Sequence, residues 1–441
     1  MNYREAMEYM EQAGQYGVVP GLESVRQLCG RMGNPQESLK FVHIAGTNGK
    51  GSVSAFVASV LKCAGCRVGS FSSPALKERE SIRVNQVPIT QKAFCQGMEL
   101  VKEVCGGMQK EGLPHPTPFE METALGFWYF REKQCDIVVL ETGMGGLLDA
   151  TNIVEHTCAA VITSISRDHT QFLGETLSGI AAHKAGILKK GCRAVTGVQK
   201  PEVMEVIREK AAGLGCPLTV ADAGGAAHVH YGLERQWFDY GGYSKVEIGL
   251  AGQYQIENAV LALETLKCLK ESGFPVTEAS LRKGMARAQW PGRFAVIGRK
   301  PWFVADGAHN EDAAVRLRES VELYFPGRRV IFIMGMLKDK EHEKVIAGMH
   351  SLADQIITVT PPDNPRALPA YLLAREAAEY HKNVTAADSL EEAVEMSYLL
   401  AGKEDVILAF GSLSFMGRLP DIVGKRKGAE GKGNARGNKS V

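Results

Sequence analysis

The sequence lacks the long apolar runs that cross membranes, and it carries almost no net charge. No stretch reaches the ~18 consecutive apolar residues of a transmembrane helix. The first residues, Met1 to Ala6, contain no apolar core of a signal peptide. A formal net charge of +1 gives no sign of general binding to nucleic acids or membranes. We therefore expect a cytoplasmic protein without a nucleic-acid or membrane partner.

Paired cysteine motifs, short-period repeats and coiled-coil heptads are scarce as well. The ten cysteines are scattered, which suits reduced thiols rather than a disulfide framework. Cys63 and Cys66 have the spacing of redox or zinc sites, but no second pair follows them. They also fall where a helix is expected to end, at Gly65. We interpret this pair as structural.

What the sequence does contain is the alternation of strands and helices typical of an α/β enzyme. Its 441 residues suggest two or three domains, and 45% hydrophobic with 23% charged residues is the balance of a globular enzyme. Short apolar runs, typical of parallel strands buried on both faces, alternate with helical periodicity. The strand runs are 41–45, 67–71, 136–140 and 159–165, and the first helix covers Ser52 to Lys62. This order predicts a doubly wound sheet.

A second, smaller parallel sheet is expected after a break at Trp290–Arg293. The strand runs resume at 302–305, 330–334, 355–359 and 405–410. We expect one domain over 1–293, a second over 297–423, and a basic tail over 424–441. That tail is rich in Gly, Lys and Asn and poor in apolar residues, so we expect it to be disordered and solvated rather than phosphate-binding.

A glycine-rich loop separates the first strand from the first helix. Its residues are Gly46, Thr47, Asn48, Gly49, Lys50, Gly51 and Ser52. The spacing is shorter than G-x-x-x-x-G-K-[ST], and a glycine follows Lys50. Glycines nevertheless let backbone N–H groups face phosphate oxygens, and the helix N-terminus adds its dipole. Lys50 would neutralise the β/γ-phosphates, with Ser52 near Mg²⁺. The alternative is a turn with an incidental lysine; the strand before and the helix after favour phosphate binding.

Polar side chains follow three further strand runs. Ser73 follows the second strand, Glu141 the run 136–140, and His169 the run 159–165. In open α/β sheets ligands bind outside the carboxyl ends of the strands, so these groups and Ser52 should converge. Hydroxyl, carboxylate and imidazole groups suit Mg²⁺ that bridges ATP phosphates. Taken singly, Ser73 would be a turn former, Glu141 a helix cap and His169 a loop residue; their shared position favours a metal site.

At this point the sequence resembles a known family. The string His43–Ser52 is similar to the phosphate loop of folylpolyglutamate synthase and dihydrofolate synthase, in the Mur ligase superfamily. The glycine after Lys50 favours this folate branch over the cell-wall ligases. Further elements match in the family's order. They are 72–74, 141–146, 148–152, 184–187, 255–259, 290–293, 306–310, 335–340 and 411–412. The fold implied is α/β: a large P-loop-type doubly wound domain followed by a smaller, Rossmann-like C-terminal α/β domain.

The resemblance also implies roles for individual residues. The loop residues 46–52 would bind ATP phosphates, and Ser52, Ser73, Glu141 and His169 would hold Mg²⁺. Asn258, Arg293, Asp306 and His309 would reach ATP, with Lys50, His169 and Arg293 among the catalytic groups. Lys184 would be carboxylated by CO₂, and its anionic carbamate would help to position a second Mg²⁺. Phe119, Glu120, Leu148, Asp149, Ala150 and Thr151 would line the pterin pocket. The alternative for Arg293 is a hinge residue, and the alternative for Asp306 to His309 is an ordinary strand exit.

The implied activity is ATP-dependent addition of L-glutamate to dihydropteroate, to reduced folates or to both, in folate biosynthesis and one-carbon metabolism. The acceptor carboxylate would attack the γ-phosphorus of ATP, and the glutamate amine would displace phosphate from the acyl phosphate. We expect a monomer. Four positions depart from the family pattern: Ala75, Leu147, His183 and Tyr254. The first two lie near the acceptor side and leave the exact acceptor open.

Two other interpretations stay open: another Mur-type amino-acid ligase, and a non-catalytic nucleotide-binding homologue. A kinase or motor is disfavoured by the second sheet, which carries Asp306 and His309.

Overall fold

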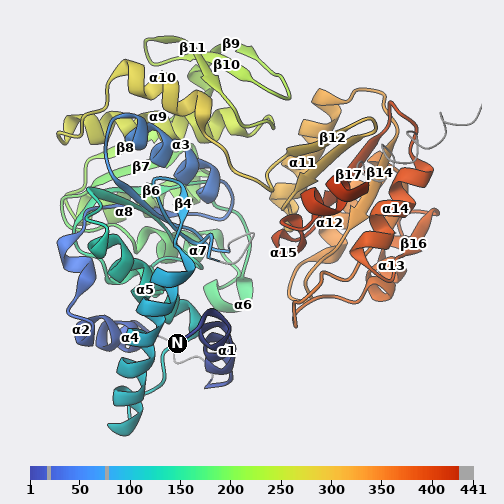
Figure 1. Cartoon of the computed structure of the whole chain (residues 1–441). Coiled ribbons are helices and arrows are strands. Elements are labelled where there is room, and N and C mark those ends of the chain that lie inside the picture. The colour runs from blue at the N-terminus through green and yellow to red at the C-terminus, as the bar shows by residue number, and fades with distance from the viewer. Residues whose placement is uncertain (17–20, 75–78, 427–441) are drawn as a thin grey trace, which may run out of the picture. The chain divides into compact units, whose positions relative to one another are not determined.

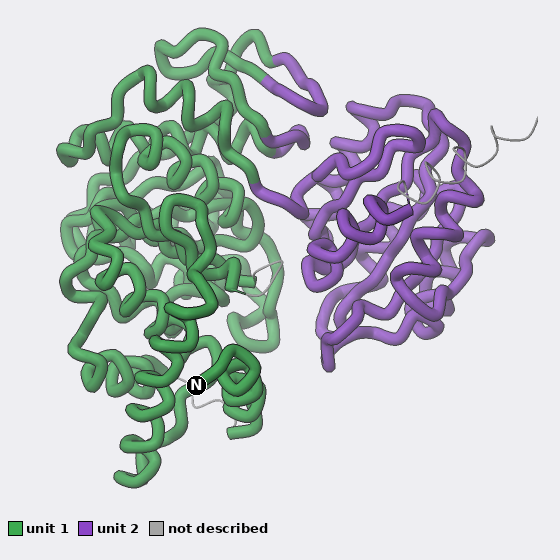
Figure 2. The backbone as a smooth tube through the Cα atoms, viewed as in Figure 1, with its two compact units in different colours: residues 1–229, 237–249, 255–289 green, residues 230–236, 250–254, 290–441 purple. Residues whose placement is uncertain are grey.

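The computed structural model describes residues 1–16, 21–74 and 79–426. Contacts divide the chain into two compact units (Figure 2). The first unit holds residues 1–229, 237–249 and 255–289, and the second holds 230–236, 250–254 and the chain from Trp290 onward. The division at Trp290 lies close to the expected boundary, whereas the two short inserted segments were not expected. In the part of the chain that the structure describes, no helix is both long and apolar enough to cross a membrane.

The first unit is built on an eight-stranded sheet (Figure 1). In spatial order its strands are β4 (Val87–Pro88), β3 (Ile82–Val84), β2 (Val68–Phe71), β5 (Ile137–Glu141), β1 (Phe41–Ala45), β6 (Thr157–Ile162), β7 (Arg193–Gly197) and β8 (Leu218–Ala221). All neighbours from β2 to β8 are parallel, and the edge strands β3 and β4 are antiparallel. The predicted doubly wound sheet is thus confirmed, with an antiparallel edge added.

Helices flank this sheet. They are α1 (Tyr3–Ala13), α2 (Glu23–Arg31), α3 (Lys50–Cys63), α4 (Gln91–Lys110), α5 (Pro118–Glu132), α6 (Thr170–Leu173), α7 (Leu177–Ala185), α8 (Pro201–Gly213), α9 (Gln255–Glu271) and α10 (Glu278–Arg287). Short 3₁₀ turns are η1 (Gly14–Tyr16), η2 (Pro35–Ser38), η3 (Ala150–Ile153) and η4 (Ala223–Gly225). Helix α3 packs against α9 and α10. A separate three-stranded sheet has the order β11 (Tyr243–Ile248), β10 (Gln236–Tyr240), β9 (Ala227–His230).

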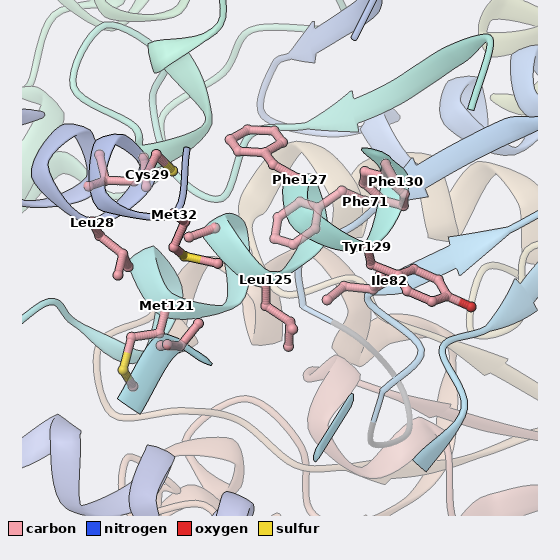
Figure 3. Close-up of a cluster of buried hydrophobic side chains, with 14 of the residues drawn as sticks. Leu28, Cys29, Met32, Phe71, Ile82, Met121, Leu125, Phe127, Tyr129 and Phe130 are labelled. Carbon is pink, nitrogen blue, oxygen red and sulfur yellow. The ribbon is translucent and has the colours of Figure 1, made fainter. Parts of the chain in front are cut away.

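Helix α5 shows how local sequence and packing cooperate. Thr117 caps it, Pro118 opens it, and the Glu120 side chain returns to the Thr117 backbone, which satisfies otherwise unpaired N–H groups. Its buried face joins side chains of α2 and β2 in an apolar cluster drawn in Figure 3. Phe127 and Phe130 are almost completely buried there, and each contributes about 1.5–3 kcal/mol by leaving water.

The second unit contains the second predicted sheet. Its strand order is β12 (Ala295–Arg299), β13 (Trp302–Asp306), β17 (Val406–Phe410), β14 (Val330–Met334), β15 (Ala353–Thr358) and β16 (Val384–Ala386). Neighbours from β13 to β16 are parallel, and β12 is antiparallel to β13. Its helices are α11 (Glu311–Tyr324), α12 (His342–Met349), α13 (Ala370–Ala378), α14 (Leu390–Leu400) and α15 (Leu413–Met416), with the turn η5 (His350–Leu352).

The structured chain runs three residues beyond the expected start of the basic tail. Residues 419–426 are helical. The Arg426 guanidinium donates to Glu395 at 3.1 Å and lies 4.1 Å from the ring centroid of Tyr398. These contacts to α14 explain why residues 424–426 are ordered, a correction to the expectation of disorder there. Residues 427–441 lie outside the described part of the chain.

Candidate active site

The glycine-rich loop connects β1 directly to α3, as the sequence predicts. Two of the three loop glycines have positive φ, 154° at Gly46 and 89° at Gly49. The Thr47 N–H donates to the Ser164 carbonyl at 2.7 Å, and the Thr163 hydroxyl donates to the Asn48 carbonyl at 2.6 Å. The segment after β6 therefore fixes the shape of the loop. Such a loop at a helix N-terminus is an anion-binding site.

Gly46 has no room for a side chain. A Cβ there would lie 1.8 Å from Thr163 Oγ1 and 3.2 Å from the Thr163 Cα, so a rotation of the hydroxyl would not relieve the clash. We expect Gly46→Ala to displace the loop, to weaken nucleotide binding and to lower stability by about 1–3 kcal/mol. Calorimetric titration with an ATP analogue and urea unfolding measure the two effects. Gly197→Ala, where a Cβ meets open space, is the matched control. Unchanged affinity in Gly46→Ala would contradict this description of the loop.

Two lysines converge on the loop. Lys50 Nζ donates to the carbonyl oxygens of Gly46 at 3.1 Å and Thr47 at 3.2 Å. Lys184, in α7, is 3% exposed and donates to the same Gly46 oxygen at 2.8 Å. Burial, and then the Lys50 charge, lower the pKa of Lys184 to about 7 against the opposing pull of Asp168 and Asp149. Near neutral pH, Lys184 therefore has a large neutral fraction, the form that reacts with CO₂.

The expected metal ligands belong to four adjacent parallel strands. The order β2, β5, β1, β6 places Ser73 after the first, Glu141 at the end of the second, the loop with Ser52 after the third, and His169 after the fourth. Glu141 is 5% exposed and lies in register with Ile44. The described residues contain no cluster of three or more His, Cys, Asp and Glu side chains suited to a metal. The expected site contains only two side chains of these types, Glu141 and His169. Metal binding there stays a prediction.

Helix α9 supplies a contact that the sequence did not reveal. Gln255, fully buried, donates from Nε2 to the Ser52 hydroxyl at 3.2 Å, and Asn258 Nδ2 donates to the Gln255 side-chain oxygen Oε1 at 3.1 Å. Asn258 also adjoins Gly49, where a Cβ would lie 2.4 Å from Asn258 Oδ1. The expected nucleotide residue Asn258 is thus next to the loop. Gln255 stood in a matching motif, but nothing in the sequence indicated its partner.

Residues 143–152, which we call the acceptor loop, follow Glu141. The backbone N–H of Leu147 donates to the His183 carbonyl at 2.7 Å, and the Asn152 amide donates to the carbonyls of Leu147 at 3.0 Å and Gly186 at 3.1 Å. These bonds attach the loop to the end of α7, the helix that carries Lys184. Leu147 and Leu148 are exposed, at 43% and 52%.

The residues expected to line the pterin pocket differ in their exposure and in the contacts they already make. Phe119 borders Gly143, where a Cβ would lie 2.6 Å from its ring, and it lies 6.0 Å from the ring of Phe71. The Glu120 carboxylate caps α5 by accepting from the Thr117 N–H at 2.7 Å. Asp149, Ala150 and Thr151 are buried, whereas Leu148 is exposed. Contact with an acceptor stays a prediction for all of them.

In the second unit, Asp306 at the end of β13 organises the chain around it. Its carboxylate accepts from the Tyr254 hydroxyl at 2.7 Å, the Phe294 N–H at 2.7 Å and the Ala308 N–H at 2.8 Å. Burial, followed by the Asp306 charge, raises the pKa of Tyr254 well above its ordinary value. His309 Nδ1 lies 2.7 Å from the Gly307 carbonyl oxygen. Tyr254, a departure from the family pattern, thus has a structural role.

Tyr254→Phe should destabilise this unit. The change leaves the buried Asp306 carboxylate with one donor fewer, which costs about 1–3 kcal/mol. Urea unfolding measures the loss, and Tyr371→Phe, at a tyrosine that is 67% exposed on α13, is the control. Equal midpoints for the two variants would show that the Tyr254 hydroxyl contributes nothing.

Among the other departures, Leu147 and His183 meet each other through the backbone bond already described. Ala75 lies outside the described residues. The Cys63–Cys66 pair lies at and just after the end of α3, and all ten cysteines have free thiols.

The fold and this site define a Mur ligase. The model of the Mur ligase middle domain matches residues 44–266, and that of the Mur ligase glutamate ligase domain matches residues 292–413. Two curated relatives cover nearly the whole chain. The dihydrofolate synthase/folylpolyglutamate synthase of Bacillus subtilis is 34% identical over 94% of this chain and 97% of its own. The protein of the same name from Escherichia coli is 31% identical over 96% and 95%.

Solved structures agree with these relatives. Mycobacterium tuberculosis folylpolyglutamate synthase complexed with ADP and AMPPCP superposes with a TM-score of 0.88 at 28% identity, covering 96% of this chain and 99% of its own. E. coli FolC in complex with DHPP and ADP superposes with a TM-score of 0.84 at 29% identity, over 97% and 99%. The chain belongs to the dihydrofolate synthase/folylpolyglutamate synthase family.

Proposed function

We propose that this protein is an ATP-dependent ligase that joins L-glutamate by an amide bond to dihydropteroate, to the γ-carboxylate of (poly)glutamylated folates, or to both. The observation that carries the proposal is the convergence of Lys50 and Lys184 on the Gly46 carbonyl, at 3.1 and 2.8 Å. A phosphate loop alone would serve many reactions. A second, buried lysine, on a helix to which the acceptor loop is bonded, favours transfer from ATP to a bound second substrate.

The reaction follows from the weak electrophilicity of a carboxylate. The acceptor carboxylate attacks the γ-phosphorus of ATP, which gives an acyl phosphate and ADP. The glutamate amine then attacks the acyl carbon, and phosphate leaves. The Lys50 ammonium and the N–H groups at the start of α3 stabilise negative charge on the transferring phosphoryl group. The relatives complexed with ADP and AMPPCP support this use of ATP.

Three of the four donor groups at the carboxyl edge of the sheet supply oxygen, the ligand atom that Mg²⁺ prefers, and Mg²⁺ often retains waters as further ligands. We propose that Ser52, Ser73, Glu141 and His169 hold one ion, and that a carboxylated Lys184 positions a second. When bound, Mg²⁺ neutralises charge on the phosphate oxygens. Gln255 orients the Ser52 hydroxyl by its hydrogen bond. Roles for Arg293, Asp306 and His309 toward ATP stay predictions from the resemblance.

A phosphate-release assay tests the function. The purified chain is mixed with ATP and Mg²⁺, with and without L-glutamate, against a panel of dihydropteroate, reduced folates and their polyglutamates. Release should require glutamate and an acceptor together, and mass spectrometry should find the acceptor one glutamate heavier. If none of these acceptors supports ATP turnover, the folate assignment is refuted.

A second candidate function, a Mur-type ligase with another acceptor, is favoured by Leu147. Its exposed aliphatic side chain lies in the acceptor loop, where the family commonly has arginine. The same assay with other carboxylate acceptors, including cell-wall precursors, separates the two. Turnover that requires a non-folate acceptor would establish the alternative.

We further propose that the protein works as a monomer in the cytoplasm, without a nucleic-acid or membrane partner. The near-zero net charge and the scattered cysteines, which suit reduced thiols, support this placement. Light scattering during size-exclusion chromatography should give the mass of one chain.

A further inference from the structure

We propose that His43, inside β1, is a positioning residue that fixes the acceptor loop through a buried hydrogen-bond chain, His43 to Thr151 to Asp149. The inference rests on the proposed function for what the loop binds. Its structural part, that these hydrogen bonds determine the shape of the acceptor loop, is independent of that function.

The direction of each hydrogen bond in the chain is defined by chemistry. His43 is fully buried, and its Nε2 lies 2.9 Å from the Thr151 hydroxyl oxygen. That hydroxyl donates its single proton to Asp149 Oδ1 at 2.6 Å. Because a hydroxyl has only one proton, His43 must be the donor, from Nε2–H. The imidazole is thereby held in one tautomer.

Asp149 in turn accepts hydrogen bonds from the backbone of the acceptor loop. Its Oδ1 also accepts from the Thr151 N–H at 3.1 Å, and its Oδ2 accepts from the Met144 N–H at 2.8 Å. One carboxylate therefore joins the glycine-rich start of the loop to its end. Rotation of Asp149 would break both attachments, and the Thr151 hydroxyl, locked by His43, opposes that rotation.

The histidine is not suited to proton transfer. Burial, and then the charge of Lys189, lower the pKa of His43 to about 3, so the ring stays neutral at physiological pH. Among the described residues its Nδ1 has no hydrogen-bond partner. Burying an unsatisfied ring nitrogen costs free energy that a leucine would avoid. The benefit of the histidine is therefore the Nε2–H that it points at Thr151.

The position of His43 in the strand links this benefit to the site. Only two residues, Ile44 and Ala45, separate it from Gly46, whose carbonyl oxygen accepts from both lysines. The strand that presents the phosphate loop at its end thus holds the acceptor loop from its middle. An acceptor loop of defined shape keeps the carboxylate of a bound acceptor in a fixed relation to the phosphate loop, which is what phosphoryl transfer between two substrates requires.

The test compares His43→Leu with His43→Gln, whose amide places an N–H donor near the position of Nε2. Hydrogen exchange followed by mass spectrometry should show faster exchange in the peptide covering 143–152 for His43→Leu. The peptide covering 193–197 in β7 is the internal control, and His43→Gln should restore slow exchange. No change in the exchange of 143–152 in His43→Leu would overturn the proposal, whatever reaction the protein catalyses.

Kinetics then tests the functional half. In the phosphate-release assay His43→Leu should raise the KM for the acceptor roughly tenfold, the size of one lost hydrogen bond, and leave the KM for ATP within about twofold. Thr151→Val should do the same, and the His43→Leu/Thr151→Val double variant should be no worse than either single variant. An effect on the KM for ATP alone, or additive effects, would overturn this half. An inactive wild type would instead refute the proposed function.

Discussion

A Lys50→Ala variant is expected to lose about 10³-fold in the rate of glutamate-dependent phosphate release, at the upper end of what removing one transition-state donor costs. The Lys50 ammonium lies against the phosphate loop, 3.1 Å from the carbonyl oxygen of Gly46 and 3.2 Å from that of Thr47. In the proposed reaction it faces negative charge that grows as the phosphoryl group transfers. The loss should therefore appear mainly in kcat.

Lys62→Ala is the matched control for this variant. Lys62 lies near the other end of the same helix, is exposed, and donates to Gln86 at 3.3 Å. Its loss removes the same charge and the same number of atoms without touching the loop. Comparable kcat in Lys50→Ala and the wild type would argue against catalysis at this loop. An active wild type with an inactive Lys50→Ala variant would exclude the non-catalytic homologue.

The second large effect is expected at Lys184. Lys184→Met removes the buried amine with little change in volume, and we expect about a 10²-fold loss of activity. An unmodified lysine in the cationic form would repel the metal that the carbamate would attract, so carboxylation by CO₂ is central to this residue's role. Carbon-13 NMR after exposure to labelled bicarbonate should show one carbamate signal in the wild type and none in Lys184→Met.

Dependence on CO₂ follows, with a defined direction in pH. Only the neutral amine attacks CO₂, and it releases a proton as the carbamate forms. With the pKa of Lys184 lowered to about 7 by burial, the neutral form dominates above pH 7 and declines below it. Activity lost in CO₂-free buffer should thus return roughly tenfold more slowly on adding CO₂ at pH 6 than at pH 8. Full activity without CO₂, together with no carbamate signal, would show that Lys184 acts as a plain amine.

The strands that present the site were predictable because they are largely apolar and buried. Every residue of β1 and β5 is buried, and a continuous apolar run is a strong signal for such strands. Their parallel order, β2, β5, β1, β6, then brings the residues after each strand to one edge of the sheet. Position after a strand end, rather than residue type, is what makes Glu141 and His169 candidates for the predicted metal site.

Other parts could not be read from the sequence. The edge strands β3 and β4 have only three and two residues, too few for a periodic pattern. The sheet of β9 to β11 has mostly half-exposed or exposed residues and so lacks an apolar run.

Contacts between distant residues were also out of reach. Gln255 meets Ser52 across 203 residues, and His43 meets Thr151 across 108. Polar pairs of this kind depend on how loops and helices pack in the tertiary structure, which no local sequence pattern encodes. The same holds for Tyr254, whose hydroxyl finds Asp306 in the second unit.

The most direct measurement follows the oxygen atoms of the acceptor. If the acceptor carboxylate, labelled with ¹⁸O at both positions, attacks ATP, one labelled oxygen becomes the bridge of the acyl phosphate and leaves with the phosphate. Mass spectrometry should then find one ¹⁸O in each released phosphate and one in the new amide. Unlabelled phosphate, or a stable phosphorylated product accumulating without glutamate, would contradict the assignment of this protein as an acyl-phosphate ligase.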